Sequence, residues 1–279
     1  MSGSLFNSLQ LVSIIAKGRY SEIYKYINKD TAKLYVIKKH PVELLGYKKE
    51  CNVREMEALE LIEQHPNIIK YYSYSKDEEY GYFLLEYING YDLNRIIFES
   101  KHEEIEKQVA TVSIIKYLLQ VLEALKHIHK SKVYHCDVKP ENILIYKDSV
   151  KLVDFGSAII SQEKIIKVTN EDFVGTPGYL PPEIANHEYK GYVDLEFVDL
   201  FGFGSTMYFC FSKTLPFKGN YNSEVNFNVK NLEVKLNIIE EVGIKEILQH
   251  IYTKDFNERW DINQVKNNLE EILKKYIDM

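Results

Sequence analysis

Two polar motifs, separated by a short stretch of chain, constrain this sequence more than any other feature. The first reads His-Cys-Asp-Val-Lys-Pro-Glu-Asn over residues 135–142, and three apolar residues follow it. The second, Asp154-Phe155-Gly156, begins twelve residues after Asn142. A lone Asp-Phe-Gly occurs by chance, and a polar run of the first kind is usually a solvated turn. Both motifs together, in this order and at this spacing, leave little room for those neutral interpretations.

In these residues the sequence resembles the eukaryotic protein kinase family, and the resemblance covers nearly the whole chain. It implies a single domain over 1–279 with an α+β fold of two lobes. A small antiparallel β-sheet lobe with one helix would span 1–87, and a larger, mainly helical lobe would span 88–279. The hinge would lie near 86–91 and the activation segment over 154–183. The implied reaction transfers the γ-phosphoryl group of Mg-ATP to protein serine or threonine hydroxyls, with Mn²⁺ as a substitute metal.

Phosphoryl transfer explains why such residue types are needed, because the enzyme mainly positions and neutralises the negative charge of the nucleotide. Asp154 would ligate magnesium, and Asn142 would hold a second metal ion through its amide oxygen. Asp137 would accept or orient the proton of the substrate hydroxyl. Lys139 would lie beside the transferring phosphoryl group, and in this family a lysine here accompanies serine/threonine specificity.

A lysine in the first forty residues would complete the phosphate site. Lys38 ends the run Tyr-Val-Ile-Lys in an expected strand. The resemblance implies that it bridges the α- and β-phosphates and pairs with a helix carboxylate. Glu55 is favoured over Glu57 for this pairing, because Leu59 and Ile62 then fall on the side of the helix that should face the core. By itself, a lysine at a strand end is most often solvated.

The glycine-rich loop departs from the family pattern. Residues 16–21 read Ala-Lys-Gly-Arg-Tyr-Ser, so only Gly18 remains of three glycines. Ala16 and Ser21 are small, which still permits close approach of the backbone to phosphates. We therefore expect a stiffer cover over the phosphates than in most members of the family.

The resemblance also assigns an adenine-binding slot. Glu86 and Ile88 would offer backbone hydrogen bonds at the hinge, Leu85 would be the gatekeeper, and Asp92 would reach the ribose. The remaining residues assigned to nucleotide binding are Ile15, Gly18, Ile23, Val36 and Leu144. Core packing explains the apolar types equally well, so only their positions favour the slot.

Further along the chain, residues 175–183 resemble the segment that seats a substrate peptide. Thr176 would form hydrogen bonds near the catalytic aspartate and lysine, which is again typical of serine/threonine kinases. Glu183 would pair with Arg259, and Asp199 would hold the backbone of the catalytic loop, since a buried aspartate requires partners. These last three residues would be structural.

Cys136 stands where many members of the family have arginine. That arginine binds a phosphorylated activation loop through charge-assisted hydrogen bonds, which a neutral thiol cannot do. We therefore hypothesise that phosphorylation of Ser157, Ser161 or Thr169 is not strictly required for activity. A buried, inert cysteine is favoured over a reactive thiol.

The distribution of residue types along the chain agrees with two segregated lobes, because strand patterns come first and helical patterns later. The residues 157–174 have no firm period, and a loop of that length is usually functional. The expected strands are Leu9–Ile15, Ser21–Ile27, Ala32–Lys38, Ile68–Ser73 and Tyr80–Tyr87, and the expected helices are Glu50–Gln64, Ser113–His129, Leu195–Phe211 and Asn263–Ile277.

Composition narrows the class of protein. With 35 Lys and Arg against 41 Asp and Glu, the net charge is −6, so we expect no nucleic-acid partner. The three cysteines form no Cys-x-x-Cys pair and no secretory signal is visible, which favours an intracellular protein, cytoplasmic or nuclear. The apolar run 195–211 contains two acidic residues and predicts a buried helix, with no membrane span. The expected partners are protein substrates and a regulatory protein. We expect the enzyme to be monomeric and to have no autoinhibitory tail.

Three other readings of function remain open. A pseudokinase or scaffold with little turnover is favoured slightly by the reduced glycine loop and by Cys136. The presence of Lys38, Asp137, Asn142 and Asp154 weighs against it, because a scaffold has no chemical need for them. A small-molecule or lipid acceptor ranks below a peptide, and a tyrosine kinase is disfavoured.

Overall fold

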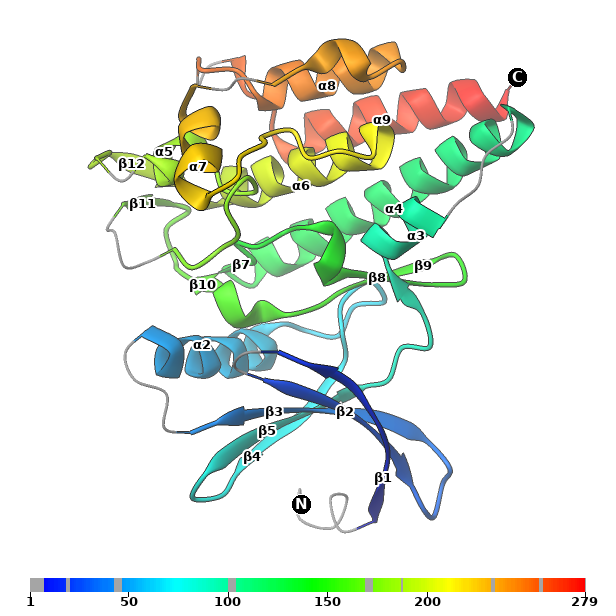
Figure 1. Cartoon of the computed structure of the whole chain (residues 1–279), viewed down its shortest axis with the longest axis vertical. Helices are drawn as coiled ribbons and strands as arrows, with labels where there is room; N and C mark the ends of the chain where they lie inside the picture. Colours follow the sequence, from blue (N-terminus) through cyan, green and yellow to red (C-terminus); the bar gives the residue numbers. More distant parts are fainter. Residues whose placement is uncertain are drawn as a thin grey trace.

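Five antiparallel strands and the helix α2 form the described part of the smaller lobe of the computed structural model (Figure 1). The model describes residues 8–18, 21–42, 47–99, 104–168, 173–186, 188–231, 234–255 and 258–278. The elements of this lobe are β1 (Leu9–Lys17), β2 (Glu22–Asn28), β3 (Leu34–Pro41), α2 (Tyr47–Leu61), β4 (Tyr71–Lys76) and β5 (Tyr80–Glu86). The strand order is β1-β2-β3-β5-β4, and α2 lies between the sheet and the larger lobe.

The larger lobe is mainly helical and carries short strands next to the site. Its helices are α3 (Leu93–Glu99), α4 (Glu104–Lys130), α5 (Pro182–Ala185), α6 (Leu195–Ser212), α7 (Asn222–Asn231), α8 (Val242–Ile251) and α9 (Ile262–Ile277). Its strands are β6 (Tyr91–Asp92), β7 (Val133–Tyr134), β8 (Ile143–Tyr146), β9 (Ser149–Leu152), β10 (Ile159–Ile160), β11 (Ile165–Lys167) and β12 (Tyr192–Asp194). They pair as β6-β8-β9, β10-β7 and β11-β12. The fold class expected from the sequence is therefore confirmed.

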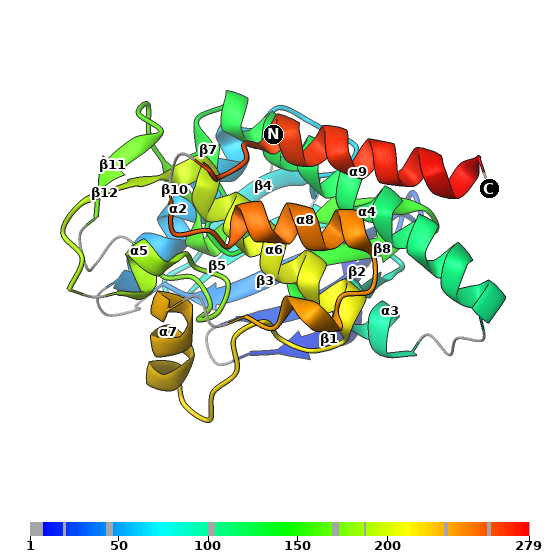
Figure 2. The ribbon, with the colours of Figure 1, turned by 90° about the horizontal axis from the view of Figure 1, so that it is seen from above.

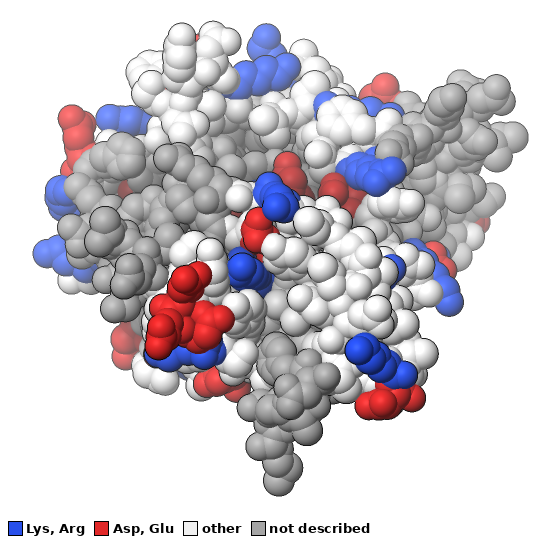
Figure 3. All heavy atoms as spheres, turned by 60° about the horizontal axis from the view of Figure 1, so that its bottom comes forward, with Lys and Arg blue, Asp and Glu red and all other residues white. Residues whose placement is uncertain are grey.

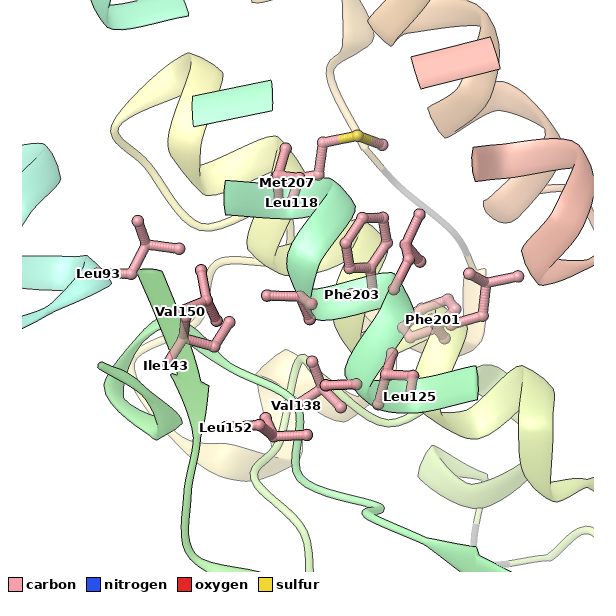
Figure 4. Packing of buried hydrophobic residues seen from close by; sticks show 14 of the residues in the cluster. Leu93, Leu118, Leu125, Val138, Ile143, Val150, Leu152, Phe201, Phe203 and Met207 are labelled. Atoms are coloured by element: carbon pink, nitrogen blue, oxygen red, sulfur yellow. The ribbon is translucent and has the colours of Figure 1, made fainter. Parts of the chain in front are cut away.

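The core of the larger lobe is formed by residues of α4 and α6 together with residues of β8 and β9. Phe201 and Phe203 of α6 and Leu118 and Leu125 of α4 are fully buried in it (Figure 4). Nearly every residue of α6 is buried, as its apolar sequence predicted. Seen from above, α8 and α9 cover this pair of helices (Figure 2). The described part of the chain contains no helix with the length and apolar character that a membrane crossing requires.

The alternation of β3 explains how the sheet faces the site. Lys38 and Val36 point to one face, whereas Tyr35 and Ile37 pack with Leu84 on the other. On the view that brings this lobe forward, acidic and basic side chains are interspersed among uncharged ones (Figure 3).

The structure corrects one expected strand and extends one helix. The run 68–73 does not begin a strand, because β4 starts at Tyr71. Ile69 instead donates its N–H to the Leu152 carbonyl (3.0 Å), and Leu152 donates to the Asn67 carbonyl (2.8 Å). The apolar pair Ile68-Ile69 is thus buried against β9 of the other lobe. Helix α4 begins well before the expected residue 113.

Candidate active site

The two lobes meet at an ion cluster centred on Lys38. Its Nζ lies 2.7 Å from both carboxylate oxygens of Glu55 and 2.9 Å from Oδ1 of Asp154. The choice between Glu55 and Glu57 therefore falls on Glu55, whose side chain is buried, while Glu57 is exposed. Burial alone would lower the pKa of Lys38, but the carboxylates of Asp154 and Glu55 outweigh it and raise this pKa.

Asp154 stands at the entrance of a short 3₁₀ turn, Phe155–Ser157, in a left-handed backbone conformation (φ 64°). Phe155 is fully buried and its ring packs on His135 of the catalytic loop, with centroids 4.9 Å apart. This anchor directs the Asp154 carboxylate toward Lys38. The Lys38 ammonium lowers the pKa of Asp154 to about 2, so the carboxyl is ionised at neutral pH although half of its side chain is exposed.

Asp199 of α6 is completely buried and supports the backbone of the catalytic loop, residues 135–142. Its Oδ1 accepts the N–H of Cys136 (2.7 Å), and its Oδ2 accepts the N–H of His135 (2.9 Å). The same Oδ2 lies 2.7 Å from Nε2 of His129 at the end of α4. Because Cys136 has φ 58°, an unfavourable left-handed conformation, these bonds help to hold the turn. The expected role of Asp199 is present in the structure.

Asp137 lies at the centre of a hydrogen-bonded group that joins the catalytic loop to the segment 175–183. Its Oδ2 is 2.7 Å from Nζ of Lys139, and its Oδ1 accepts the N–H of Thr176 (2.9 Å). Lys139 Nζ in turn donates to Oγ1 of Thr176 (2.6 Å). Asp137 is nearly buried. The contacts expected of Thr176 are therefore formed.

Asn142 closes the same loop. Its Nδ2 donates to the Asp137 carbonyl (2.9 Å), so its Oδ1 is the atom left to meet a cation. Carboxylate and amide oxygens of this kind suit Mg²⁺ or Mn²⁺. Within the described residues no three His, Cys, Asp or Glu side chains gather into a metal cage.

The slot expected for adenine is lined by half-buried residues. Ile23, Val36 and Leu144 are each partly exposed, and Ile15 at the end of β1 is 49% exposed. Oδ1 of Asp92 accepts the N–H of Arg95 (2.8 Å), which lies in the first turn of α3. Ile88 is partly buried just beyond β5.

The hinge itself is fixed by contacts on both sides. The side chain of Glu86 accepts the N–H of Lys70 (2.7 Å) and pairs with Nζ of Lys151 (2.7 Å), while its own N–H donates to the Lys70 carbonyl (2.9 Å). A Cβ at Gly90 would lie 2.0 Å from the Ile145 carbonyl oxygen, so only glycine fits there.

The described ends of the loop between β1 and β2 are joined by a turn and a surface ion pair. Gly18 donates its N–H to the Ser21 carbonyl (2.8 Å), and Lys17 pairs with Glu22 at 3.1 Å on the surface. Tyr24 also donates its hydroxyl to Glu22. Arg19 and Tyr20 lie outside the described residues.

With this geometry established, comparison with known proteins decides the family. The model of the protein kinase domain matches residues 9–270. The chain belongs to the protein kinase family. Serine/threonine-protein kinase PKH2 of Saccharomyces cerevisiae is 27% identical over 269 residues, which is 92% of this kinase domain but 24% of that protein.

Two further relatives have similar identity. Calcium-dependent protein kinase 5 of Plasmodium berghei is 31% identical over 268 residues, which is 91% of this chain and 44% of that protein. Aurora kinase C of Mus musculus is 28% identical over 264 residues, which is 93% of this chain and 90% of that protein. The kinase domain thus spans less than half of the yeast and Plasmodium relatives.

Several residues of the kinase domain were missed by the sequence analysis. The position of His129, at the end of a long amphipathic helix, could have drawn attention to it, but nothing in the sequence indicated its contact with Asp199. Lys151 lies three residues before Asp154 and reaches Glu86 only through the fold. The strand β11 fell in the stretch 157–174, for which a loop was expected.

The three hydroxyl residues whose phosphorylation we expect not to be required differ in their surroundings. Ser157 ends the 3₁₀ turn and is partly buried, and Ser161 Oγ donates to the Glu163 carbonyl (2.7 Å). Thr169 lies outside the described residues. Cys136 is buried, and burial raises the pKa of its thiol, which agrees with an inert cysteine.

Proposed function

We propose that this kinase domain transfers the γ-phosphoryl group of Mg-ATP to serine or threonine hydroxyls of protein substrates. The observation that carries the proposal is the joined group of Asp137, Lys139 and Thr176. It places a carboxylate, an ammonium and the peptide-seating segment within hydrogen-bond distance of one another. Substrate proteins and the cellular location, which we place in the cytoplasm or nucleus, are part of the same proposal.

In this proposal the chain's residues divide the work by charge. The oxygens of Asp137 carry lone pairs beyond those used by Lys139 and Thr176, so the carboxylate can accept the hydrogen of an incoming hydroxyl and orient its oxygen. Lys139 places positive charge beside the oxygen that attacks. A metal ion, when bound at Asp154 and Asn142, supplies charge neutralisation for the phosphates.

Lys38 would bind phosphate oxygens with an ammonium that Glu55 holds in place. Because Glu55 is buried and contacts Lys38 with both oxygens, the ammonium keeps its position when Asp154 turns to another partner. The backbone carbonyl of Glu86 and the backbone of Ile88 would bind the adenine edge, and Asp92 would reach the ribose. Positioning of this kind supplies most of the catalysis in phosphoryl transfer.

A pseudokinase is the second candidate, because the β1–β2 loop retains only Gly18. In that case the domain would bind nucleotide or protein partners with little turnover. The buried Lys38–Glu55 pair and the engaged Asp137 support the enzyme over this alternative.

The test is transfer of labelled γ-phosphate from Mg-ATP to a basic protein and to the kinase itself. Wild type would be run beside Asp137→Asn and Asp154→Asn, with Asp148→Asn, an exposed aspartate of the same lobe, as the matched control. We expect labelled serine or threonine in wild type and control, and a loss of about 10²- to 10⁴-fold in Asp137→Asn. Nucleotide binding by a folded wild type without transfer above the mutants would instead support the pseudokinase.

A further inference from the structure

The activation segment is joined to the larger lobe by a two-stranded ribbon, which we define as β11 and β12. Residues 165–167 pair antiparallel with residues 192–194, which lead directly into α6. Two further backbone bonds extend the ribbon at its ends. Val168 donates its N–H to the Gly191 carbonyl (2.9 Å), and Leu195 donates to the Lys164 carbonyl (2.7 Å). The ribbon lies at the edge of the molecule beside α5 and α7 (Figure 1).

Lys164 fastens the end of the ribbon through its side chain as well. Its Nζ lies 3.1 Å from Oδ2 of Asp194 and 3.3 Å from Oε2 of Glu196. Asp194 uses its other oxygen, Oδ1, to accept the N–H groups of Glu196 (3.0 Å) and Phe197 (3.4 Å), which caps α6. One carboxylate thus connects the activation segment to the helix that carries Asp199.

The inner side of the ribbon is apolar where a phosphate-binding site would be charged. Cys136 belongs to a buried cluster with Val168, Val193, Leu195 and Leu180. Ile159 and Ile166 of the activation segment pack against the same cluster. The thiol that replaces arginine is therefore part of a hydrophobic contact between the catalytic loop and the activation segment.

We propose that the ribbon, fastened by Lys164, holds the activation segment in the position that other kinases obtain through a phosphate, and that Lys164 is a positioning residue for the bound peptide. The proposal rests on the proposed function for its effect on catalysis. The ribbon restrains residues 164–168, which precede the segment 173–183, and Thr176 of that segment contacts Asp137 and Lys139. Loosening the ribbon should therefore weaken peptide binding and leave the nucleotide site intact.

Amide hydrogen exchange tests the ribbon without any need for activity. The variant is Lys164→Met, and the conservative variant is Lys164→Arg, which can still reach both carboxylates. Lys167→Met is the matched control, because Lys167 is exposed on the same strand and has no ion pair with another described residue. Since the two ion pairs are partly exposed, we expect amides 165–168 and 192–195 to exchange about 3- to 10-fold faster in Lys164→Met alone. Equal exchange in Lys164→Met and Lys167→Met would overturn the role of Lys164.

Steady-state kinetics then test the positioning role. We expect Lys164→Met to raise KM for a peptide about 3- to 10-fold, to leave KM for ATP within about 2-fold, and to be rescued by Lys164→Arg. Treatment of wild type with a phosphatase should change neither constant. A loss of activity after phosphatase treatment, or an equal rise of both KM values in Lys164→Met, would contradict the proposal. If wild type transfers no phosphate, the proposed function fails, while the exchange experiment still decides whether Lys164 fastens the ribbon.

Discussion

The catalytic loop and the loop between β1 and β2 belong to opposite lobes of one site, and their described residues make different kinds of contact. In the catalytic loop, buried Asp199 binds two backbone N–H groups and His129, and Asp137 binds Lys139 and Thr176. In the described ends of the β1–β2 loop, Gly18 donates its N–H to the Ser21 carbonyl, and Lys17 forms a surface ion pair with Glu22. Among the described residues, buried carboxylates therefore hold the catalytic loop, whereas the ends of the β1–β2 loop are joined by a turn bond and an exposed ion pair.

The largest effect is expected at the support of the catalytic loop. Asp199→Asn removes a buried charge that faces three donors, and we expect it to lower the free energy of unfolding by about 3 kcal/mol. Urea unfolding would measure this, with the exposed Asp148→Asn as control, which should stay within about 0.5 kcal/mol of wild type. Equal stability of the two variants would mean that the bonds of Asp199 to the catalytic loop do not stabilise the folded state.

A smaller effect is expected where the catalytic loop meets the peptide-seating segment. Thr176→Val keeps the shape of the side chain but removes the acceptor for Lys139. Because a hydrogen bond to a charged group is lost, we expect kcat to fall about 10-fold, with KM for ATP unchanged. Thr176→Ser keeps the hydroxyl and should recover most of the rate. A Thr176→Ser enzyme as slow as Thr176→Val would argue against a role of the hydroxyl.

Acid should weaken the contact between the lobes. The pKa of Asp154, held at about 2 by Lys38, is below its usual value, so its ionised form stabilises the folded state above about pH 4. This contribution is lost as the pH falls through about 2. The stability of wild type relative to Asp154→Asn should therefore decrease between pH 5 and pH 2, by less than about 1 kcal/mol because the carboxylate is half exposed. If the ion pair did not contribute, urea titrations would show that the difference in free energy of unfolding between wild type and Asp154→Asn stays constant or grows as the pH falls.

The smallest effect is expected in the β1–β2 loop. A Cβ at Gly18 would lie 3.3 Å from the Ser21 carbonyl oxygen, which a slight shift of the turn can relieve. Gly18→Ala should therefore change KM for ATP by no more than about 2-fold. A 10-fold rise, measured by initial rates at saturating peptide, would reverse the comparison and make this glycine a strict requirement.

The residues expected to contact phosphates or the substrate hydroxyl could be assigned from the sequence because motifs and their spacing carry them. Asp137, Asn142 and Asp154 lie in short local motifs, and Glu55 was chosen over Glu57 from helical periodicity alone. The roles of these residues in catalysis stay predictions, whereas their geometry is now described.

What could not be predicted depends on contacts between distant segments. The burial of Ile68-Ile69 against β9 follows from the packing of the lobes, and an apolar pair before a strand gives no sign of it. The ribbon escaped notice because β11 and β12 are each three residues long and lie 24 residues apart, too short for a period to appear. Turn and strand patterns are local, whereas both of these contacts are long-range.

Gly90 has a consequence for molecules that compete with the nucleotide. Gly90 has no side chain, so the hinge backbone can lie in contact with the carbonyl of Ile145 in β8. This contact sets the distance between the hinge and Leu144, the residue before Ile145. A larger residue at position 90 would push the hinge outward and deepen the slot. If the slot binds nucleotide as proposed, flat compounds that fill it closely would then lose contact on one face, so a change at position 90 would weaken them through the position of the hinge.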